Sequence, residues 1–281
     1  MADMPQKRSY QRRTPYNNKN RQMKNETLSS DTKVFALGGL NEVGKNMYCI
    51  EHQDELVIID AGVKFAEDGL PGIDYVIPDY TYLKRNQKKI KALLITHGHE
   101  DHIGGIPFLL QVVHIPFIYA SPLACAMIRR KLEEKRLTQA TKLIQINNLS
   151  QVKTKYFNIG FFKTNHSIPE SLGIVINTPN GRIVSTGDFK FDLTPVGDPA
   201  DFQVMSFLGE TGVTLLLSDS TNAEVPNFSI SEKQVAYSVQ EEFRKTEGRL
   251  IVATFASNVH RVQQIIDAAV KFNRKILVFG R

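Results

Sequence analysis

The sequence contains no tryptophan, only two cysteines and no long apolar run. Cys49 and Cys125 lack the spacing of a zinc-binding or redox pair, which predicts two reduced, buried thiols and argues against a disulfide-stabilised secreted scaffold. No apolar run approaches the roughly 20 residues that span a membrane. The beginning of the chain also lacks the apolar core of a secretory signal. These absences favour a cytoplasmic protein without a membrane partner.

Positive charge is concentrated at the start of the chain. Residues 1–33 hold eight Lys or Arg against three Asp or Glu, so they carry five of the six net positive charges of the 281-residue protein. Low hydrophobicity without periodicity predicts that residues 1–32 form a disordered basic extension. Such an extension can attract RNA through charge alone, or it can be a solvated tail without a binding role.

The most informative stretch places four candidate metal ligands within six residues: His97-Gly98-His99-Glu100-Asp101-His102. It follows the short apolar run 92–96, which we interpret as a buried strand. In an extended backbone, residues i and i+2 point the same way, so His97 and His99 can reach one ion. Asp101 and His102 come after the chain turns and can reach a second ion, whereas the phase of Glu100 directs it away.

Imidazole and carboxylate groups together suit Zn²⁺, and the same ligands accept Mn²⁺. Two such ions a few Å apart can share a hydroxide that cleaves a phosphodiester or an amide. The competing interpretation is a surface loop that happens to be rich in histidine. It is disfavoured because three of the seven histidines of the chain gather here around one aspartate.

Three more candidate site residues follow strand-like runs, and strand ends are rigid places from which to present ligands. His166 and Asp188 come after the runs 161–162 and 182–185. Asp188 is the natural bridge between two ions, because a carboxylate has two oxygens. Taken alone, His166 could be a loop histidine and Asp188 a turn former after glycine. Asp60 ends another buried run and is interpreted as a carboxylate that orients a ligand histidine.

The pattern up to about residue 208 is rich in strands. Two helices are expected, at 103–113 and at 121–137, the second with Ser121 as N-cap and Pro122 at its first position. Strands are expected at 34–37, 47–52, 55–60, 90–96, 142–146, 152–156, 161–164, 173–177 and 182–185.

The pattern changes after residue 208. Apolar runs at 213–217, 249–254 and 275–279 alternate with helical patterns at 231–245 and 260–272, and Ser231 and Gln234 have capping-box spacing. Such β-α-β-α-β alternation predicts a parallel, doubly wound unit. We therefore expect an α/β protein with one domain at 33–208 and a second at 209–281.

The order of the site motifs resembles the metallo-β-lactamase superfamily: Asp60, then His97-x-His99-x-Asp101-His102, then His166 and Asp188. The residues around these motifs form further distinctive segments at 35–40, 59–62, 72–80, 96–105, 166–170, 186–192, 218–222 and 253–258. These segments resemble the ribonuclease J family of β-CASP nucleases. The resemblance implies an αββα metallo-β-lactamase sandwich followed by the first part of an inserted, doubly wound β-CASP domain.

The resemblance also implies that this chain corresponds to the N-terminal portion of longer family proteins. In those proteins a later segment brings a further histidine ligand and a phosphate-binding motif, so the domain at 209–281 is expected to be truncated. One ion would be held by His97, His99 and His166, and the other by Asp101 and His102, with Asp188 shared between them. Asp101, His102 and Asp188 would be the catalytic residues.

Other residues receive more peripheral roles. Asp219 would support the site from a second layer, although a turn residue fits the same position. Ser257, Asn258, His260 and Arg261 lie at a strand-to-helix junction, where they could contact the RNA backbone or simply cap the helix. The loop 67–74 has enough oxygen ligands for Ca²⁺, and an ordinary solvated loop is the competing interpretation.

The implied function is a ribonuclease with two Zn²⁺ ions that hydrolyses RNA phosphodiesters by a metal-bridging hydroxide. Members of the family combine 5′-to-3′ exonuclease and endonuclease activity in rRNA processing and mRNA decay, and they form homo-oligomers or pair with a paralogous subunit. One alternative is an incomplete or inactive fragment or partner subunit of such a nuclease. Another is a generic hydrolase of the metallo-β-lactamase fold that acts on small molecules.

Overall fold

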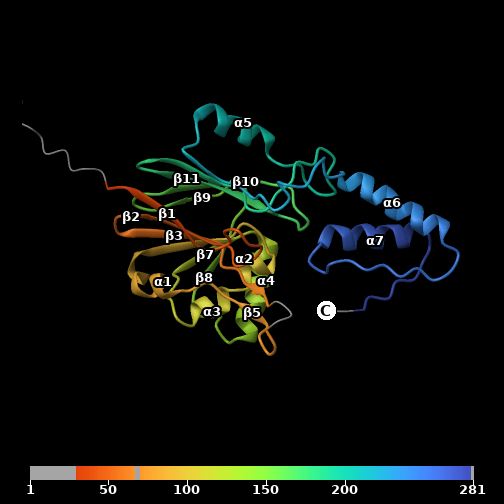
Figure 1. Cartoon of the computed structure of the whole chain (residues 1–281), viewed down its shortest axis with the longest axis horizontal. Coiled ribbons are helices and arrows are strands. Elements are labelled where there is room, and N and C mark those ends of the chain that lie inside the picture. Colours follow the sequence, from red (N-terminus) through yellow and green to blue (C-terminus); the bar gives the residue numbers. More distant parts are fainter. Residues whose placement is uncertain (1–29, 67–69, 280–281) are drawn as a thin grey trace, which may run out of the picture.

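The computed structural model describes residues 30–66 and 70–279. Two β-sheets lie face to face in its first part, and helices cover their outer sides (Figure 1). The first sheet has the order β1-β2-β3-β6-β7-β8. Its strands are β1 (Thr32–Gly38), β2 (Met47–His52), β3 (Glu55–Ile59), β6 (Ile90–Leu94), β7 (Phe117–Ala120) and β8 (Lys142–Gln145). The pairs from β1 to β3 are antiparallel and those from β3 to β8 are parallel.

The second sheet has the order β13-β12-β11-β10-β9. Its strands are β9 (Gln151–Lys153), β10 (Asn158–Lys163), β11 (Leu172–Thr178), β12 (Gly181–Ser185) and β13 (Leu215–Leu217). Only the pairing of β12 with β13 is parallel. A short ribbon of β4 (Lys64–Phe65) and β5 (Tyr75–Val76) forms a separate two-stranded sheet.

Three hydrophobic clusters lie between the layers. The cluster between the sheets combines Ile59 and Leu94 of the first sheet with Ile159 and Ile174 of the second. The outer face of the first sheet packs against α1 (Thr81–Arg85), α3 (Ile106–Leu110) and α4 (Pro122–Glu134). The outer face of the second sheet packs against Leu208 of α5 (Phe202–Thr211). Alternate side chains of a strand point to opposite faces, so the two-sided burial of these strands explains the αββα layering, which confirms the predicted sandwich.

Most predicted elements of this part form close to their expected limits. Cys49 and Cys125 are buried free thiols of the core, as predicted. Ser121 is the N-cap of α4 and Pro122 its first residue, although the Ser121 side chain makes no capping hydrogen bond. The predicted basic extension at 1–32 falls outside the described residues except for its last three, and Thr32 already belongs to β1.

The single helix predicted at 103–113 is wrong. The chain forms two short helices there, α2 (Glu100–Ile103) and α3, with Gly104 and Gly105 between them. The N–H of Gly105 donates to the carbonyl of Ala61 at 2.8 Å instead of continuing the helix. Pro107 has no N–H to donate to a preceding turn, so it is suited to the first turn of a new helix, which begins at Ile106.

The second part of the chain forms fewer strands than predicted. The run at 213–217 contributes β13, which pairs with β12 and so belongs to the second sheet rather than to a separate unit. The helices α6 (Glu232–Lys245) and α7 (Val259–Lys271) form as predicted, and the Ser231 side chain caps α6 by accepting from the N–H of Gln234.

No strand forms at 249–254 or at 275–279 among the described residues, so those two predictions are wrong for this structure. A strand needs a hydrogen-bonded neighbour, and these runs have none among the described residues. Ile251 and Phe279 are accordingly 86% and 100% exposed. The domain limits 33–208 and 209–281 stay predictions. No described helix has the length and apolar character needed to cross a membrane.

Candidate metal centre

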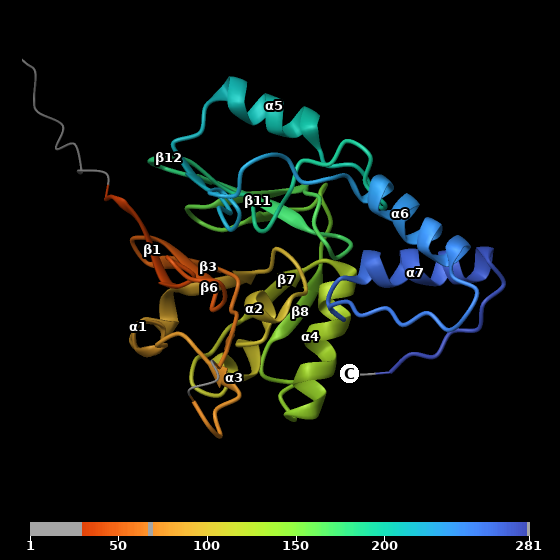
Figure 2. The ribbon, with the colours of Figure 1, turned by 45° about the vertical axis from the view of Figure 1, so that its right-hand side comes forward.

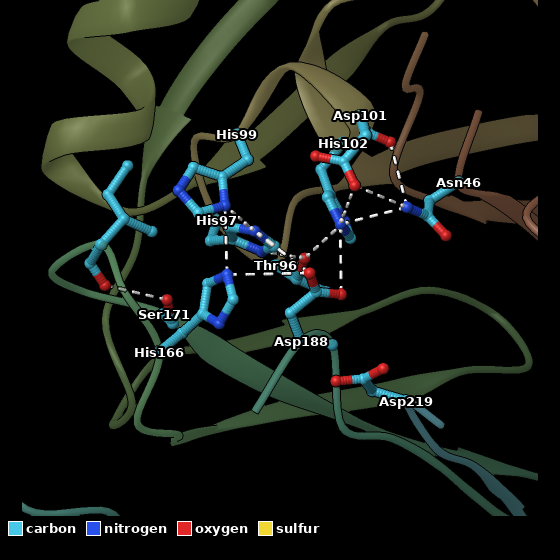
Figure 3. Close-up of polar contacts among 12 residues, drawn as sticks. Asn46, Thr96, His97, His99, Asp101, His102, His166, Ser171, Asp188 and Asp219 are labelled. Carbon is cyan, nitrogen blue, oxygen red and sulfur yellow. Dashed lines mark hydrogen bonds and ion pairs between the residues drawn. The ribbon is translucent and has the colours of Figure 1, made fainter. Parts of the chain in front are cut away.

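The candidate ligands meet where strands of the two sheets end (Figure 3). His97 and His99 follow β6, and Asp101 and His102 lie in the adjoining helix α2. The other two ligand candidates come from the second sheet, one after β10 and one after β12. All six predicted ligands therefore lie in one place, although they are spread over 92 positions of the chain, from His97 to Asp188.

The first group consists of His97, His99, His166 and Asp188, whose ligand atoms lie within 4.8 Å of one another. Nδ1 of His99 lies 3.1 Å from Nε2 of His97 and 3.1 Å from Nε2 of His166. Three ring nitrogens so close together converge on one point. Such a set of imidazoles with one carboxylate fits a tetrahedral Zn²⁺ or a similar divalent ion.

The second group consists of Asp101, His102 and Asp188. Nε2 of His102 lies 3.4 Å from Oδ2 of Asp101 and 3.2 Å from Oδ1 of Asp188. The other oxygen of Asp188, Oδ2, lies 3.7 Å from Nε2 of His166 and 4.0 Å from Nε2 of His97. Asp188 therefore turns one oxygen toward each group, which is the position of a bridging carboxylate.

Asp60 lies behind this arrangement and contacts both Thr96 and His102. Its carboxylate accepts hydrogen bonds from the main-chain N–H of Thr96 at 2.9 Å and from the Thr96 hydroxyl at 2.8 Å. Its Oδ2 also lies 2.8 Å from Nδ1 of His102. Nδ1 of His102 therefore carries the proton, and Nε2 faces the second group with a free lone pair when the ring is neutral. The proximity is what the predicted orienting role of Asp60 requires, and the role itself stays a prediction.

The protonation of the histidines differs between the two groups in the metal-free protein. Burial lowers the pKa of His166 to about 4, against the opposing charge of Asp188. Burial, reinforced by neighbouring histidines, also lowers the pKa of His97 well below its usual value. Burial acts in the same direction on His102, but the charge of Asp60 and hydrogen bonds to three carboxylates raise its pKa well above the usual value. The histidines of the first group are therefore neutral and keep lone pairs for an ion, whereas His102 of the second group holds a proton that an ion must displace.

Sequence reasoning missed two residues that build the site. Nδ2 of Asn46 donates to the carbonyl oxygen of Asp101 at 3.2 Å and to its carboxylate at 3.3 Å, and lies 3.1 Å from Nε2 of His102. A Cβ on Gly62 would lie 1.5 Å from the carbonyl oxygen of Asp101, so only glycine allows this approach. The only available signal was that both residues lie in polar or glycine-rich loops beside strand ends.

A family model described as the metallo-beta-lactamase superfamily matches residues 40–236. The chain belongs to the metallo-β-lactamase superfamily. A second model, described as the ribonuclease J beta-CASP domain, matches residues 247–281. These matches confirm the fold class and the resemblance inferred from the sequence.

The chain is similar to ribonucleases J from bacteria. It is 60% identical to ribonuclease J 1 of Streptococcus pyogenes over 90% of this chain and 45% of the relative. It is 46% identical to ribonuclease J of Mycoplasma pneumoniae over 89% of this chain and 44% of the relative. The chain thus spans about half the length of the curated relatives it matches. A protein of unknown function from Enterococcus faecalis V583 shares the fold, with a TM-score of 0.64 and 18% identity over 84% of this chain and 63% of that one.

Other residues of the superfamily motif and its surroundings lie apart from the ligands. Glu100 points away as predicted, and its carboxylate accepts a hydrogen bond from Nζ of Lys131 at 2.5 Å. The Asp219 side chain accepts from the N–H and hydroxyl of Thr221 at 2.8 and 2.6 Å, as in a turn. Figure 3 shows Asp219 below Asp188 without a contact to the ligands, so its supporting role stays a prediction.

The predicted RNA contacts surround the start of α7. Asn258 caps this helix, because its side chain accepts from the N–H of Arg261 at 2.9 Å. The Arg261 guanidinium faces Glu232 at 3.4 Å, while the Ser257 carbonyl faces His99. His260 lines a cavity of about 600 Å³ beside the metal-ligand candidates. The RNA-binding role of these four residues stays a prediction.

The predicted calcium loop at 67–74 is described only in part. Residues 67–69 lie outside the described residues, and they include two of its three carboxylates. Asp74 contributes a main-chain carbonyl that accepts from the N–H of Ala66 at 3.2 Å. The calcium site stays a prediction.

Proposed function

We propose that this protein is a zinc-dependent ribonuclease that hydrolyses RNA phosphodiesters in RNA maturation and decay, by 5′-to-3′ exonuclease and endonuclease activity. The observation that carries the proposal is the position of Asp188, whose two oxygens face two different ligand groups. A carboxylate in this position suits a dinuclear hydrolytic site. RNA as the substrate is supported by the similarity to ribonuclease J proteins.

Each ligand candidate has a role in this proposal. His97, His99 and His166 hold one ion, Asp101 and His102 hold the other, and Asp188 is shared. Zn²⁺ is favoured because three of four ligands in the first group are imidazoles, and Mn²⁺ is the alternative that accepts the same set. Two ions in these positions supply an activated water for attack on phosphorus and offset the negative charge of the phosphodiester.

The residues around the ions prepare the reaction. Asp60 keeps the Nε2 of His102 turned toward Asp101 and Asp188. Asn46 donates to the Asp101 carboxylate and so limits its rotation. We assign Asp101, His102 and Asp188 as the catalytic group, because their ligand atoms lie together and Asp188 also faces the first group.

The setting of this activity is also part of the proposal. RNA is the macromolecular partner, and the protein acts in the cytoplasm. A homo-oligomer or a complex with a paralogous subunit is the assembly state that the family resemblance implies. The affinity for RNA should fall as the salt concentration rises, because phosphate binding by basic side chains releases counterions.

Two alternatives are distinguished by particular observations. A generic small-molecule hydrolase of this fold is disfavoured by the match of residues 247–281 to a ribonuclease J domain. An inactive fragment or partner subunit is disfavoured by the intact first group. The inactive alternative is favoured by the second group, which has three protein ligands among the described residues, one fewer than the first group.

The decisive experiment measures zinc content and the cleavage of a 5′-monophosphorylated RNA with the same preparations. The test variant carries Asp101→Ala and His102→Ala, which removes the second group except for Asp188. The matched control is Glu100→Ala, a change within the same motif at a side chain that contacts Lys131 instead of the ligands.

About two zinc ions per chain, with cleavage lost in the double variant and kept in the control, support the proposal. One zinc ion without cleavage supports the inactive alternative for this chain, and the same assay then moves to a protein with the length of the relatives. Absence of bound metal in the unaltered chain rules out the proposed site.

A further inference from the structure

His99 is a ligand candidate whose outward-facing nitrogen is bonded by a distant part of the chain. Its Nδ1 faces His97 and His166, both at 3.1 Å, while its Nε2 lies 3.1 Å from the carbonyl oxygen of Ser257. A carbonyl oxygen can only accept, so Nε2 carries the proton and Nδ1 keeps its lone pair. The Ser257 carbonyl therefore selects the tautomer in which His99 can bind an ion through Nδ1.

Ser257 lies in the loop that leads into α7, and this loop runs back from the far end of α6 toward α4 and the metal centre (Figure 2). A second contact is made one turn later. The main-chain N–H of His260 donates to the carbonyl of Ser167 at 3.4 Å, directly after the ligand candidate His166. The start of α7 thus contacts two ligand-bearing segments of the first part of the chain.

A partly buried ion network holds the start of α7 in this position. Glu232, the first residue of α6, is paired with Arg261 of α7 at 3.4 Å and with Lys190 at 2.6 Å. Its side chain is 13% exposed, so water screens these charges less than on an open surface. The main-chain N–H of Lys190 donates to the carbonyl of Asn165 at 2.8 Å. This lysine therefore links Glu232 to the two loops that carry His166 and Asp188.

We propose that Ser257 and Glu232 are positioning residues of the metal centre. The Ser257 carbonyl holds His99 in its metal-binding tautomer, and Glu232 keeps both Ser257 and the loop of Asp188 in place. The inference rests on the metal binding of the proposed function. Because coupling between two sites is reciprocal, an ion at the first group also stabilises the contact of α7 with the metal centre. A network that only stabilises the fold would leave the metal affinity of the folded protein unchanged.

The test compares zinc affinity without RNA in the unaltered chain and in Glu232→Ala, by competition with a chromophoric chelator. The matched control is Glu241→Ala, which removes an ion pair with Arg244 on the exposed side of the same helix. Loss of a partner behind a metal ligand lowers affinity about 10- to 100-fold. Since Glu232 acts one step further away, we expect the lower end, about tenfold, at the first group. The visible spectrum of bound Co²⁺ should change with it, while the control keeps both affinity and spectrum.

The reciprocal effect is measured on the unaltered chain by hydrogen exchange. Zinc should slow the exchange of the amides at 255–261, and this result stands even if Glu232→Ala does not fold. Arg261→Gln is a milder second variant that breaks the same network. Unchanged zinc affinity in a folded Glu232→Ala variant overturns this inference alone. The same holds if zinc leaves the exchange rate of the amides at 255–261 unchanged. Failure of the unaltered chain to bind zinc overturns the proposed function as well.

Discussion

Replacing Asp60 with Asn tests whether the orientation of His102 depends on this buried carboxylate. In Asp60 one oxygen accepts from the Thr96 N–H, and the other serves both the Thr96 hydroxyl and Nδ1 of His102. An amide group in place of the first oxygen would face the Thr96 N–H, donor against donor. An amide group in place of the second oxygen would donate to Nδ1 of His102 and make it an acceptor. The metal-facing Nε2 of His102 would then carry the proton. Either orientation disturbs the second ligand group.

The backbone itself tolerates the change. Asp60 has φ of 59°, in the left-handed region that Asn adopts more readily than most residues. The two side chains also have nearly the same size. A loss of metal affinity in Asp60→Asn can therefore be assigned to hydrogen bonding and charge rather than to a distorted strand end.

The magnitude follows from two independent estimates. A hydrogen bond to a charged group contributes about 1.5–3 kcal/mol. Loss of the partner behind a metal-binding histidine lowers affinity about 10- to 100-fold, which corresponds to about 1.4–2.8 kcal/mol. Because the two ranges coincide, we expect Asp60→Asn to lower the affinity for the second ion about 10- to 100-fold. The affinity for the first ion should change far less.

The assay is a two-site zinc titration against a chromophoric chelator, accompanied by thermal unfolding of the metal-free protein. Asp54→Asn is the control, since Asp54 is exposed, pairs with the exposed Lys155, and precedes β3 at the end opposite to Asp60. Unchanged affinity for the second ion in a folded Asp60→Asn variant would refute the orienting role. An equal loss for both ions would show that Asp60 supports the whole centre rather than His102.

Protonation and close packing at the site lead to three other expected outcomes. Although burial acts to lower it, nearby carboxylates raise the pKa of His102. Binding of the second ion should therefore release a proton and strengthen as the pH rises. A calorimetric binding enthalpy that is the same in buffers of different ionisation enthalpy would contradict this. Burial lowers the pKa of His166 to about 4, so the unfolded chain binds more protons below the ordinary value near 6.5. The free energy of unfolding of the metal-free protein should then fall as the pH drops through this window, by up to about 3 kcal/mol, and urea titrations of His166→Asn should show a flatter profile. Gly62→Ala places a Cβ 1.5 Å from the Asp101 carbonyl and should cost more than the roughly 1–3 kcal/mol of ordinary overpacking; in Gly160→Ala, where a Cβ meets nothing within 4 Å, stability and zinc binding should persist, and equal stability of the two variants would refute the packing argument.

The ligand motif was readable because its geometry is local. His97 and His99 share a direction through the i, i+2 alternation of extended backbone, and the turn after them separates Asp101 and His102. His166 and Asp188 could be suggested because each follows a strand end. Their convergence on one point within 4.8 Å required the packing of two sheets.

The errors in the predicted fold have the same origin. The run at 213–217 has the composition of a buried strand, but composition cannot say which sheet it joins, and it pairs with β12. The helix predicted at 103–113 is interrupted because Gly105 donates to Ala61, a residue more than forty positions earlier in the chain. Sequence periodicity contains no information on such distant partners.

The sequence alone determined the class of the protein and the chemistry of its ligands, because strand alternation and motif spacing act over a few residues. Tertiary structure alone decided what surrounds those ligands: Asn46 beside Asp101, Gly62 beneath it, and the Ser257 carbonyl behind His99. Each of these contacts joins segments that are far apart in the chain. Hydrogen bonds and van der Waals contacts depend on distance in space, and that distance is set only when the two sheets and the start of α7 have packed together.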